Sequence, residues 1–177
     1  SIKGISFAIT INEDGNLVDV VDLRLQSGNR LLPRPVPVPQ EVKRASGILP
    51  NLLWDKTQYA LGIEANDPKA SADKVRKRAD RLPLEHGAFV EYHERVLAGQ
   101  RDEGLQALLG FLGKWNPKEN NDKLAQVPDL PSSNVIFRFA SDACWLHDRP
   151  AARALVARRW DDAPIGICLL TGENAPR

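Results

Sequence analysis

Few side chains in this 177-residue sequence stand at spacings that would support metal binding or catalysis. Cys144 and His147 have the C-x2-H spacing of half a zinc site, with Cys168 further along, but structural zinc needs four ligands, usually as two tight pairs. His86 and His93, seven residues apart on a predicted helix, do not supply the second pair. We therefore expect core cysteines and surface histidines, with no metal and no other cofactor.

The segment Glu41-Val42-Lys43 has an acid-x-Lys form, and Asp19 and Asp22 lie upstream on a predicted strand. Such carboxylates can bind Mg²⁺ while a lysine steadies the hydrolytic water of a nuclease. The Glu-x-Lys pair should itself lie on a strand, yet it follows Pro37 and Pro39. A nuclease using Glu41 and Lys43 is thus a remote alternative. The sequence also has no G-x-S-x-G elbow and no phosphate-binding glycine loop.

Charge is nearly balanced over the whole chain but not locally. There are 24 Lys and Arg against 23 Asp and Glu, a formal charge of +1, which excludes a polybasic protein and an acidic tail. Residues 69–81 hold six cations against two carboxylates, and residues 30–56 hold five against two. Clustered cations suffice for phosphate contacts, because each neutralised phosphate releases counterions. The alternative for the first cluster is a solvated helix face.

Glycine and proline in residues 43–56 predict a turn that projects Asn51 and Lys56 around three apolar residues. Asn pairs bidentately with adenine, and Lys favours guanine or phosphate, so these two side chains are candidate base readers. In the alternative interpretation Asn51 turns the backbone and Asp55 pairs with Lys56 or Arg44. The full set of predicted DNA-contacting residues is Lys43, Arg44, Asn51, Lys56, Arg30, Arg34, Lys74, Lys77 and Arg78.

The elements that must position these residues follow from hydrophobic periodicity. Residues 5–23 predict a hairpin with its turn at Asp14-Gly15. Proline at every second position of 33–39 predicts an extended surface segment that is neither helix nor central strand. Residues 40–62 show no clean period, which indicates irregular structure.

Three helices are expected next in the chain. The first is capped by Ser71 and ends before Pro83; the others begin before Phe89 and near Asp102. The first has Val75, Ala79 and Leu82 on its inner stripe, and the third places Leu105, Leu108, Leu109 and Leu112 at the spacing of a buried face. The second carries Phe89, Tyr92, His93 and Val96. A strand at 135–139, a helix capped by Asp148 and running to about Trp160, and a buried strand at 165–170 complete the order. The class is α+β, with a small mostly antiparallel sheet, an N-terminal hairpin and several helices.

Four segments resemble one family, that of the large subunit of type I-C CRISPR Cascade complexes. The most specific is residues 43–62 (KRASGILPNLLWDKTQYALG); residues 9–24, 104–112 and 168–174 are similar in order. The chain has no Met, begins at Ser1 and lacks the family's leading residues and C-terminal helical region. The resemblance therefore implies that residues 1–177 are a single N-terminal domain fragment of a larger subunit.

The resemblance implies a non-catalytic protein of antiviral defence, not an enzyme. Two cysteines are too few for a disulfide framework and ordinary for a reducing compartment, so a cytoplasmic protein is expected. It would read the protospacer-adjacent motif on double-stranded target DNA, beside crRNA-containing Cascade subunits, and would recruit a helicase-nuclease. Guide pairing supplies most sequence discrimination in such complexes, so a modest basic patch is adequate. No apolar run is long enough to span a membrane. The alternative is a protein-interaction module whose strip 33–39 docks on neighbouring Cascade subunits or the helicase-nuclease.

Overall fold

The structure, a computed structural model, is built around a four-stranded sheet. It describes residues 1–177 except 46, 120–123, 125–126, 162–164, 168–173 and 177. The strand order is β3 (Leu17–Asp22), β2 (Phe7–Ile11), β8 (Asn134–Phe139) and β7 (Trp54–Lys56). The β2–β8 pair is parallel and the other two pairs are antiparallel. The fold is α+β, as predicted.

The predicted N-terminal hairpin is confirmed as β2 and β3. The Gly15 backbone takes φ +74° and its N–H donates to the Asn12 carbonyl at 3.0 Å, so the turn uses the left-handed region that glycine favours. A Cβ on Gly15 would also lie 2.5 Å from the Phe111 nitrogen, so helix α3 (Glu103–Lys114) lies directly against this turn. The predicted strand at 135–139 is confirmed as β8.

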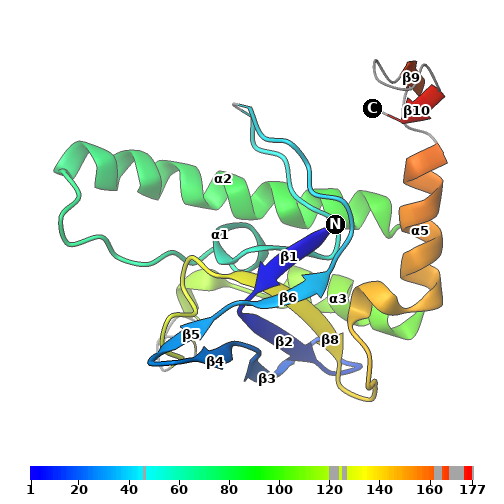
Figure 1. Ribbon diagram of the computed structural model, residues 1–177, viewed down its shortest axis with the longest axis horizontal. Coiled ribbons are helices and arrows are strands. Elements are labelled where there is room, and N and C mark those ends of the chain that lie inside the picture. The colour runs from blue at the N-terminus through cyan, green and yellow to red at the C-terminus, as the bar shows by residue number, and fades with distance from the viewer. Residues whose placement is uncertain (46, 120–123, 125–126, 162–164, 168–173, 177) are drawn as a thin grey trace.

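Both faces of the sheet are covered. On one face the alternate residues Phe7, Ile9 and Phe137 pack with Phe89 and Leu108 of the helices. On the other face a smaller cluster joins the sheet to a ribbon made of β1 (Ile2–Ile5) and β6 (Arg34–Pro37); its members are Ile5, Ala8, Leu23, Val36, Val38, Trp54 and Ile136. Figure 1 shows the helices on one side of the sheet and the ribbon crossing it. Alternate side chains of β2 thus point to opposite faces of the sheet and pack into two separate cores.

The proline strip 33–39 is extended and lies outside the central sheet, as predicted, but it is not wholly on the surface. Val36 and Val38 are buried, and the Val38 N–H donates to the Ser1 carbonyl at 2.8 Å. The outward carbonyl of Pro37 lies 2.9 Å from His147 Nε2. The outward carbonyl of Pro39 accepts a hydrogen bond from Trp54 Nε1 at 3.0 Å. The strip therefore packs on its own chain.

Residues 40–45 and 47–62 are irregular except for β7 and the single-turn helix α1 (Thr57–Ala60). Helix α3 (Glu103–Lys114) begins as predicted, because the Asp102 carboxylate accepts from the Leu105 N–H at 3.0 Å. Its residues Leu105, Leu108 and Leu112 are buried, and Leu109 is half-buried.

The predicted break before Pro83 is wrong, because α2 (Ala72–Val96) runs through it as one 25-residue helix. Ser71 caps the helix as predicted, accepting from the Lys74 N–H at 3.3 Å. Pro83 removes one helical hydrogen bond, a cost of about 3 kcal/mol. Ion pairs from Arg78 and Arg81 to Glu85 span the proline and hold the two halves in line.

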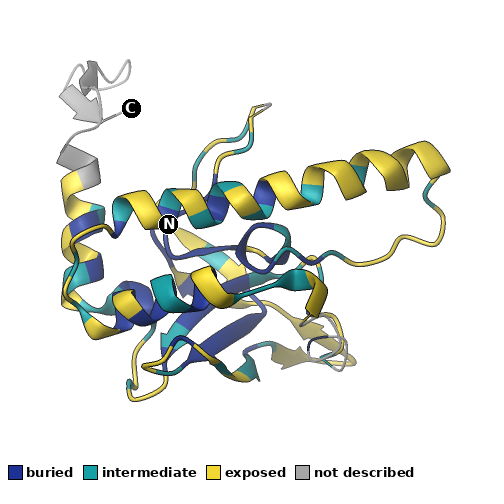
Figure 2. Cartoon of the chain, turned by 180° about the vertical axis from the view of Figure 1, so that it is seen from behind, coloured by how far each residue is buried: buried dark blue, intermediate teal, exposed yellow. Residues whose placement is uncertain are grey.

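The first half of α2 also corrects the predicted inward stripe. Val75 is 53% exposed and Ala79 is exposed, while Leu82 is half-buried. These three side chains line a cavity of about 460 Å³ between the helix and residues 64–70. Figure 2 shows this half almost wholly exposed and the second half with buried positions along one side. Phe89 and His93 are among the buried residues of the second half.

The last elements are the 3-10 turn η1 (Leu146–Asp148), helix α5 (Pro150–Asp161) and the antiparallel strands β9 (Ile165–Ile167) and β10 (Asn174–Pro176). Pro150 occupies the first helical position. The prediction that Asp148 caps this helix is wrong, because Asp148 belongs to η1. Its carboxylate pairs with Arg153 at 3.2 Å. The strand predicted at 165–170 is present over 165–167, outside the central sheet; residues 168–170, with Cys168, are outside the described residues.

Candidate nucleic-acid interface

The two basic stretches of the sequence meet at one surface cleft of about 420 Å³. Its lining comprises Arg44, Ala45, Gly47, Lys56, Gln58, Tyr59, Glu64, Arg78, Arg81 and Glu85. The first six come from the loop and short elements of residues 44–59, and the last three come from α2. In Figure 1 the loop of residues 41–45 and 47–50 projects beyond α2. The cleft is lined by loop residues Arg44, Ala45 and Gly47 on one side and by α2 on the other.

The loop is tied to its base by a brace of polar side chains. The Val42 N–H donates to Asn51 Oδ1 at 2.9 Å, and the Asn51 N–H donates to Asp55 Oδ2 at 2.8 Å. Arg44 donates to the same Asp55 oxygen and to the Leu49 carbonyl, each at 2.5 Å. One carboxylate thus fixes both ends of the loop.

The Asp55 carboxylate is 1% exposed, so its environment is unusual for a charge. Burial raises the pKa of Asp55, although hydrogen bonds from Asn51 and the nearby Arg44 guanidinium act in the opposite direction. The Arg44 guanidinium also stacks on the Tyr59 ring, 4.0 Å from its centroid. Arg44 is therefore held by three partners.

Asn51 requires a correction. It is 1% exposed, and its amide oxygen is occupied by the Val42 N–H, so in this conformation it cannot present an amide to a base edge. The alternative stated from the sequence describes its place better: Asn51 fixes the backbone, and Asp55 pairs with Arg44. Lys56 is exposed, and only its backbone N–H contacts Asp55, at 2.8 Å.

His93 is a positioning residue that the sequence did not indicate. Its Nε2 accepts from the Leu53 N–H at 3.0 Å, and its Nδ1 lies 2.8 Å from the Phe89 carbonyl. A carbonyl can only accept, so Nδ1 carries the proton and the ring is neutral. Leu53 has φ +64°, a strained value for leucine, and this bond from α2 holds it there. The expected surface histidine is instead a buried support for the 51–56 segment.

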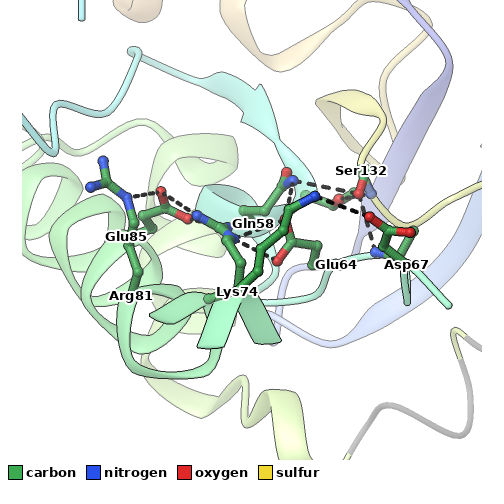
Figure 3. A network of polar contacts seen from close by, with 10 residues as sticks. Gln58, Glu64, Asp67, Lys74, Arg81, Glu85 and Ser132 are labelled. Carbon is green, nitrogen blue, oxygen red and sulfur yellow. Dashed lines mark hydrogen bonds and ion pairs between the residues drawn. The ribbon is translucent and has the colours of Figure 1, made fainter. Parts of the chain in front are cut away.

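The basic residues of α2 form a network of ion pairs with acidic neighbours (Figure 3). Arg78 contacts Glu64 at 2.9 Å and Glu85 at 3.0 Å, and Arg81 contacts Glu85 at 2.8 Å. Burial alone would raise the pKa of Glu85, but hydrogen bonds from Arg78 and Arg81 outweigh it and lower the value. The same contacts raise the pKa of Arg78. The cleft is thus much closer to neutral than its four cations suggest.

The remaining predicted DNA-contacting residues fall into two groups. Lys43 and Lys77 are exposed, and within the described residues neither has an ion pair, whereas Lys74 pairs with Asp67 at 3.0 Å. Arg30 is exposed on β5 (Arg30–Leu32) and Arg34 is exposed on β6, and these strands belong to two different two-stranded ribbons. Of the predicted DNA-contacting residues, the cleft therefore brings together Arg44, Lys56 and Arg78, whereas its lining does not include Lys43, Lys74, Lys77, Arg30 or Arg34.

The geometry does not assemble the metal chemistry considered from the sequence. Glu41 lies in an irregular loop and pairs with Lys3 of β1, and Asp22 pairs with Arg24 at 2.7 Å. The nearby histidines serve the backbone: the Nδ1 of His86 lies 2.8 Å from the Tyr59 carbonyl, and burial lowers its pKa. No group of three or more His, Cys, Asp or Glu within the described ranges is placed to hold a metal ion.

Comparison with known proteins supports the resemblance. Among the described segments, no helix combines the length and apolar character needed to cross a bilayer. A search of curated proteins gives no match. The family model described as CRISPR-associated protein (Cas_Csd1) matches residues 1–177, the entire sequence shown here. That match covers the loop, the cleft and α2, so the chain belongs to the Cas_Csd1 family, that of the large subunit of the type I-C Cascade complex, which assembles with other Cascade subunits and crRNA.

Proposed function

We propose that this chain is a non-catalytic part of Cascade that reads the protospacer-adjacent motif on duplex DNA and positions the duplex for guide pairing. One observation carries the proposal: in a Cascade-family chain, both basic stretches meet at the cleft below the projecting loop. Target DNA and the recruited helicase-nuclease are the partners that the proposal adds to crRNA and the neighbouring subunits.

The ion pairs around the cleft determine which cation we assign to which DNA contact. Arg44, Arg78 and Arg81 are held by carboxylates, so they present part of their charge to a ligand. Lys56 and Lys43 are exposed, and the described residues give them no ion pair. We assign Lys56 to a base edge and Lys43 to a phosphate of the DNA. Lys77 of α2 is assigned to a DNA phosphate further along the duplex. A few contacts of this kind suffice because the guide strand supplies the remaining affinity.

The mechanism follows from the rigidity of the loop. A base-reading side chain discriminates only if its backbone is fixed, since ordering a mobile loop on binding costs conformational entropy. The contacts among Val42, Asn51, Asp55 and Arg44 fix the loop that carries Lys43 before DNA arrives. The backbone of Lys56 is fixed by the pairing of β7 with β8. Asn51 thus serves recognition by positioning the loop and not by touching the base.

The test uses the assembled complex and compares three single substitutions. Lys56→Ala should weaken binding to motif-bearing duplex by about tenfold or more while changing binding to motif-free duplex by about twofold or less, as the loss of one base contact predicts. Lys77→Ala should weaken both duplexes equally and reduce the salt dependence, as the loss of one phosphate contact predicts. Lys118→Ala, an exposed lysine outside the cleft lining, is the control. Equal losses on both duplexes for Lys56→Ala would refute base reading.

A further inference from the structure

A second exposed feature lies away from the cleft. Strands β4 (Leu25–Ser27) and β5 (Arg30–Leu32) form a hairpin around Gly28 and Asn29, and among the described strands each pairs only with the other. All six strand residues are exposed. Figure 1 shows this hairpin at the lower left of the molecule, beside the central sheet and away from α2.

The exposed side chains of this hairpin are unusually apolar. Leu25, Leu31 and Leu32 are 48%, 47% and 47% exposed. Leu25 lies directly opposite Leu32 in the ladder, so the two side chains share one face. A two-stranded ribbon is marginal in water by itself, and apolar surface of this kind is typically buried by a partner.

The charge of the hairpin is one-sided. Residues 23–40 contain no carboxylate. Arg24, at the start of this segment, is bound by Asp22 at 2.7 Å and Asp129 at 2.8 Å. Arg30 and Arg34 are exposed, and no ion pair in the described part of the chain involves them. These two arginines are therefore accessible to carboxylates of another molecule.

We infer that the hairpin 25–32, together with Arg34, is a docking surface for another protein subunit whose contact face is apolar at its centre and carries carboxylates at its rim. The cross-strand pair Leu25 and Leu32, near two arginines without an ion pair in the described residues, matches such a face, since aliphatic side chains gain from burial against protein and little from a phosphate backbone. The family assembles with other Cascade subunits, which supply partners of this kind. The inference is independent of DNA reading, because it concerns a different surface.

The test measures the dissociation constant between the purified chain and the remaining crRNA-loaded Cascade subunits. Leu25→Ser with Leu32→Ser, and separately Arg30→Glu with Arg34→Glu, should each weaken association by about tenfold or more, as expected for central anchors and their charged neighbours. Leu84→Ser, at a 61% exposed leucine of α2, and Lys118→Glu are the matched controls and should change it by about twofold or less. Melting temperatures of all variants check that the fold is retained.

Each alternative outcome contradicts part of the inference. Unchanged association for both double variants would overturn it. A loss from the leucine pair alone would overturn the acidic rim. If the arginine pair weakened nucleic-acid binding of the complex while leaving its assembly intact, the surface would be a nucleic-acid contact instead. The DNA proposal would survive all three results, because its test depends on Lys56 and Lys77.

Discussion

Asp55 holds the candidate site in place more than any residue proposed to contact DNA. Its two oxygens accept from the backbone of Asn51, the backbone of Lys56 and the side chain of Arg44. A buried carboxylate is costly unless such partners surround it. Here the partners are also the two ends of the projecting loop, so one side chain couples the stability of the fold to the position of the loop.

Removing this carboxylate should destabilise the protein strongly. Asp55→Ala leaves the buried Asn51 N–H without an acceptor and Arg44 without its counter-ion, and we expect the free energy of unfolding to fall by about 3 kcal/mol. Urea denaturation measures the change. Asp80→Ala, at an exposed carboxylate of α2 outside the described ion pairs, should change it by less than about 0.5 kcal/mol. Comparable losses for the two variants would show that the brace is unimportant.

At the scale of elements, α2 consists of two halves with different surroundings. Its second half packs Phe89 and His93 into the core, whereas its first half extends over the cavity near residues 64–70 and is held by ion pairs. Exposed ion pairs contribute little, about 0 to 1 kcal/mol each. The first half is therefore the region of the helix expected to open most easily.

Replacing the proline at the junction should stabilise that half. Pro83→Ala supplies an N–H to the Ala79 carbonyl and removes the ring clash, and we expect a local gain of about 2 kcal/mol once the greater freedom of the unfolded chain is subtracted. Amide hydrogen exchange of residues 72–82 measures it, with Leu84→Ala as the control at an exposed neighbouring position. Slower exchange is expected only for Pro83→Ala. Unchanged or faster exchange would mean that the proline fits the helix without cost.

These elements also show which sequence signals are sufficient. The hairpin of β2 and β3, strand β8 and helix α3 were predictable because period-two or period-3.6 apolar patterns, with Gly15 and Asp102 at their ends, depend on neighbours in sequence alone. The continuation of α2 through Pro83 was not predictable, because it depends on ion pairs that the folded helix itself brings together.

The candidate site divides in the same way. Clustered cations were visible in the sequence, and their meeting at one cleft required the fold. Asn51 was assigned to the wrong role because burial is a tertiary property, although a signal existed: Asn51 and Asp55 bracket the large apolar residues Leu52, Leu53 and Trp54. Polar residues that flank such a run are buried with it and bond each other. The role of His93 had no comparable signal in sequence.

On the scale of the whole molecule, acid sensitivity should depend on Glu85. Its pKa is lowered in the folded protein, so the unfolded state binds more protons between that value and about 4.5, and stability falls as the pH drops through this window. The difference in unfolding free energy between the wild type and Glu85→Gln should therefore shrink from about pH 6 to about pH 3. Glu91→Gln, at an exposed position of the same helix, is the control. A difference that stays constant with pH would contradict the assignment.

The alternating prolines of β6 also affect how copies of this protein behave towards each other. Every N–H of this strand turns inward to β1, because the outward positions are prolines, and the outward carbonyls of Pro37 and Pro39 already have partners in His147 and Trp54. A strand from another chain therefore finds no donor on this flank to pair with. The ribbon resists templated aggregation at high concentration, and a substitution such as Pro37→Val would restore a donor and open that edge.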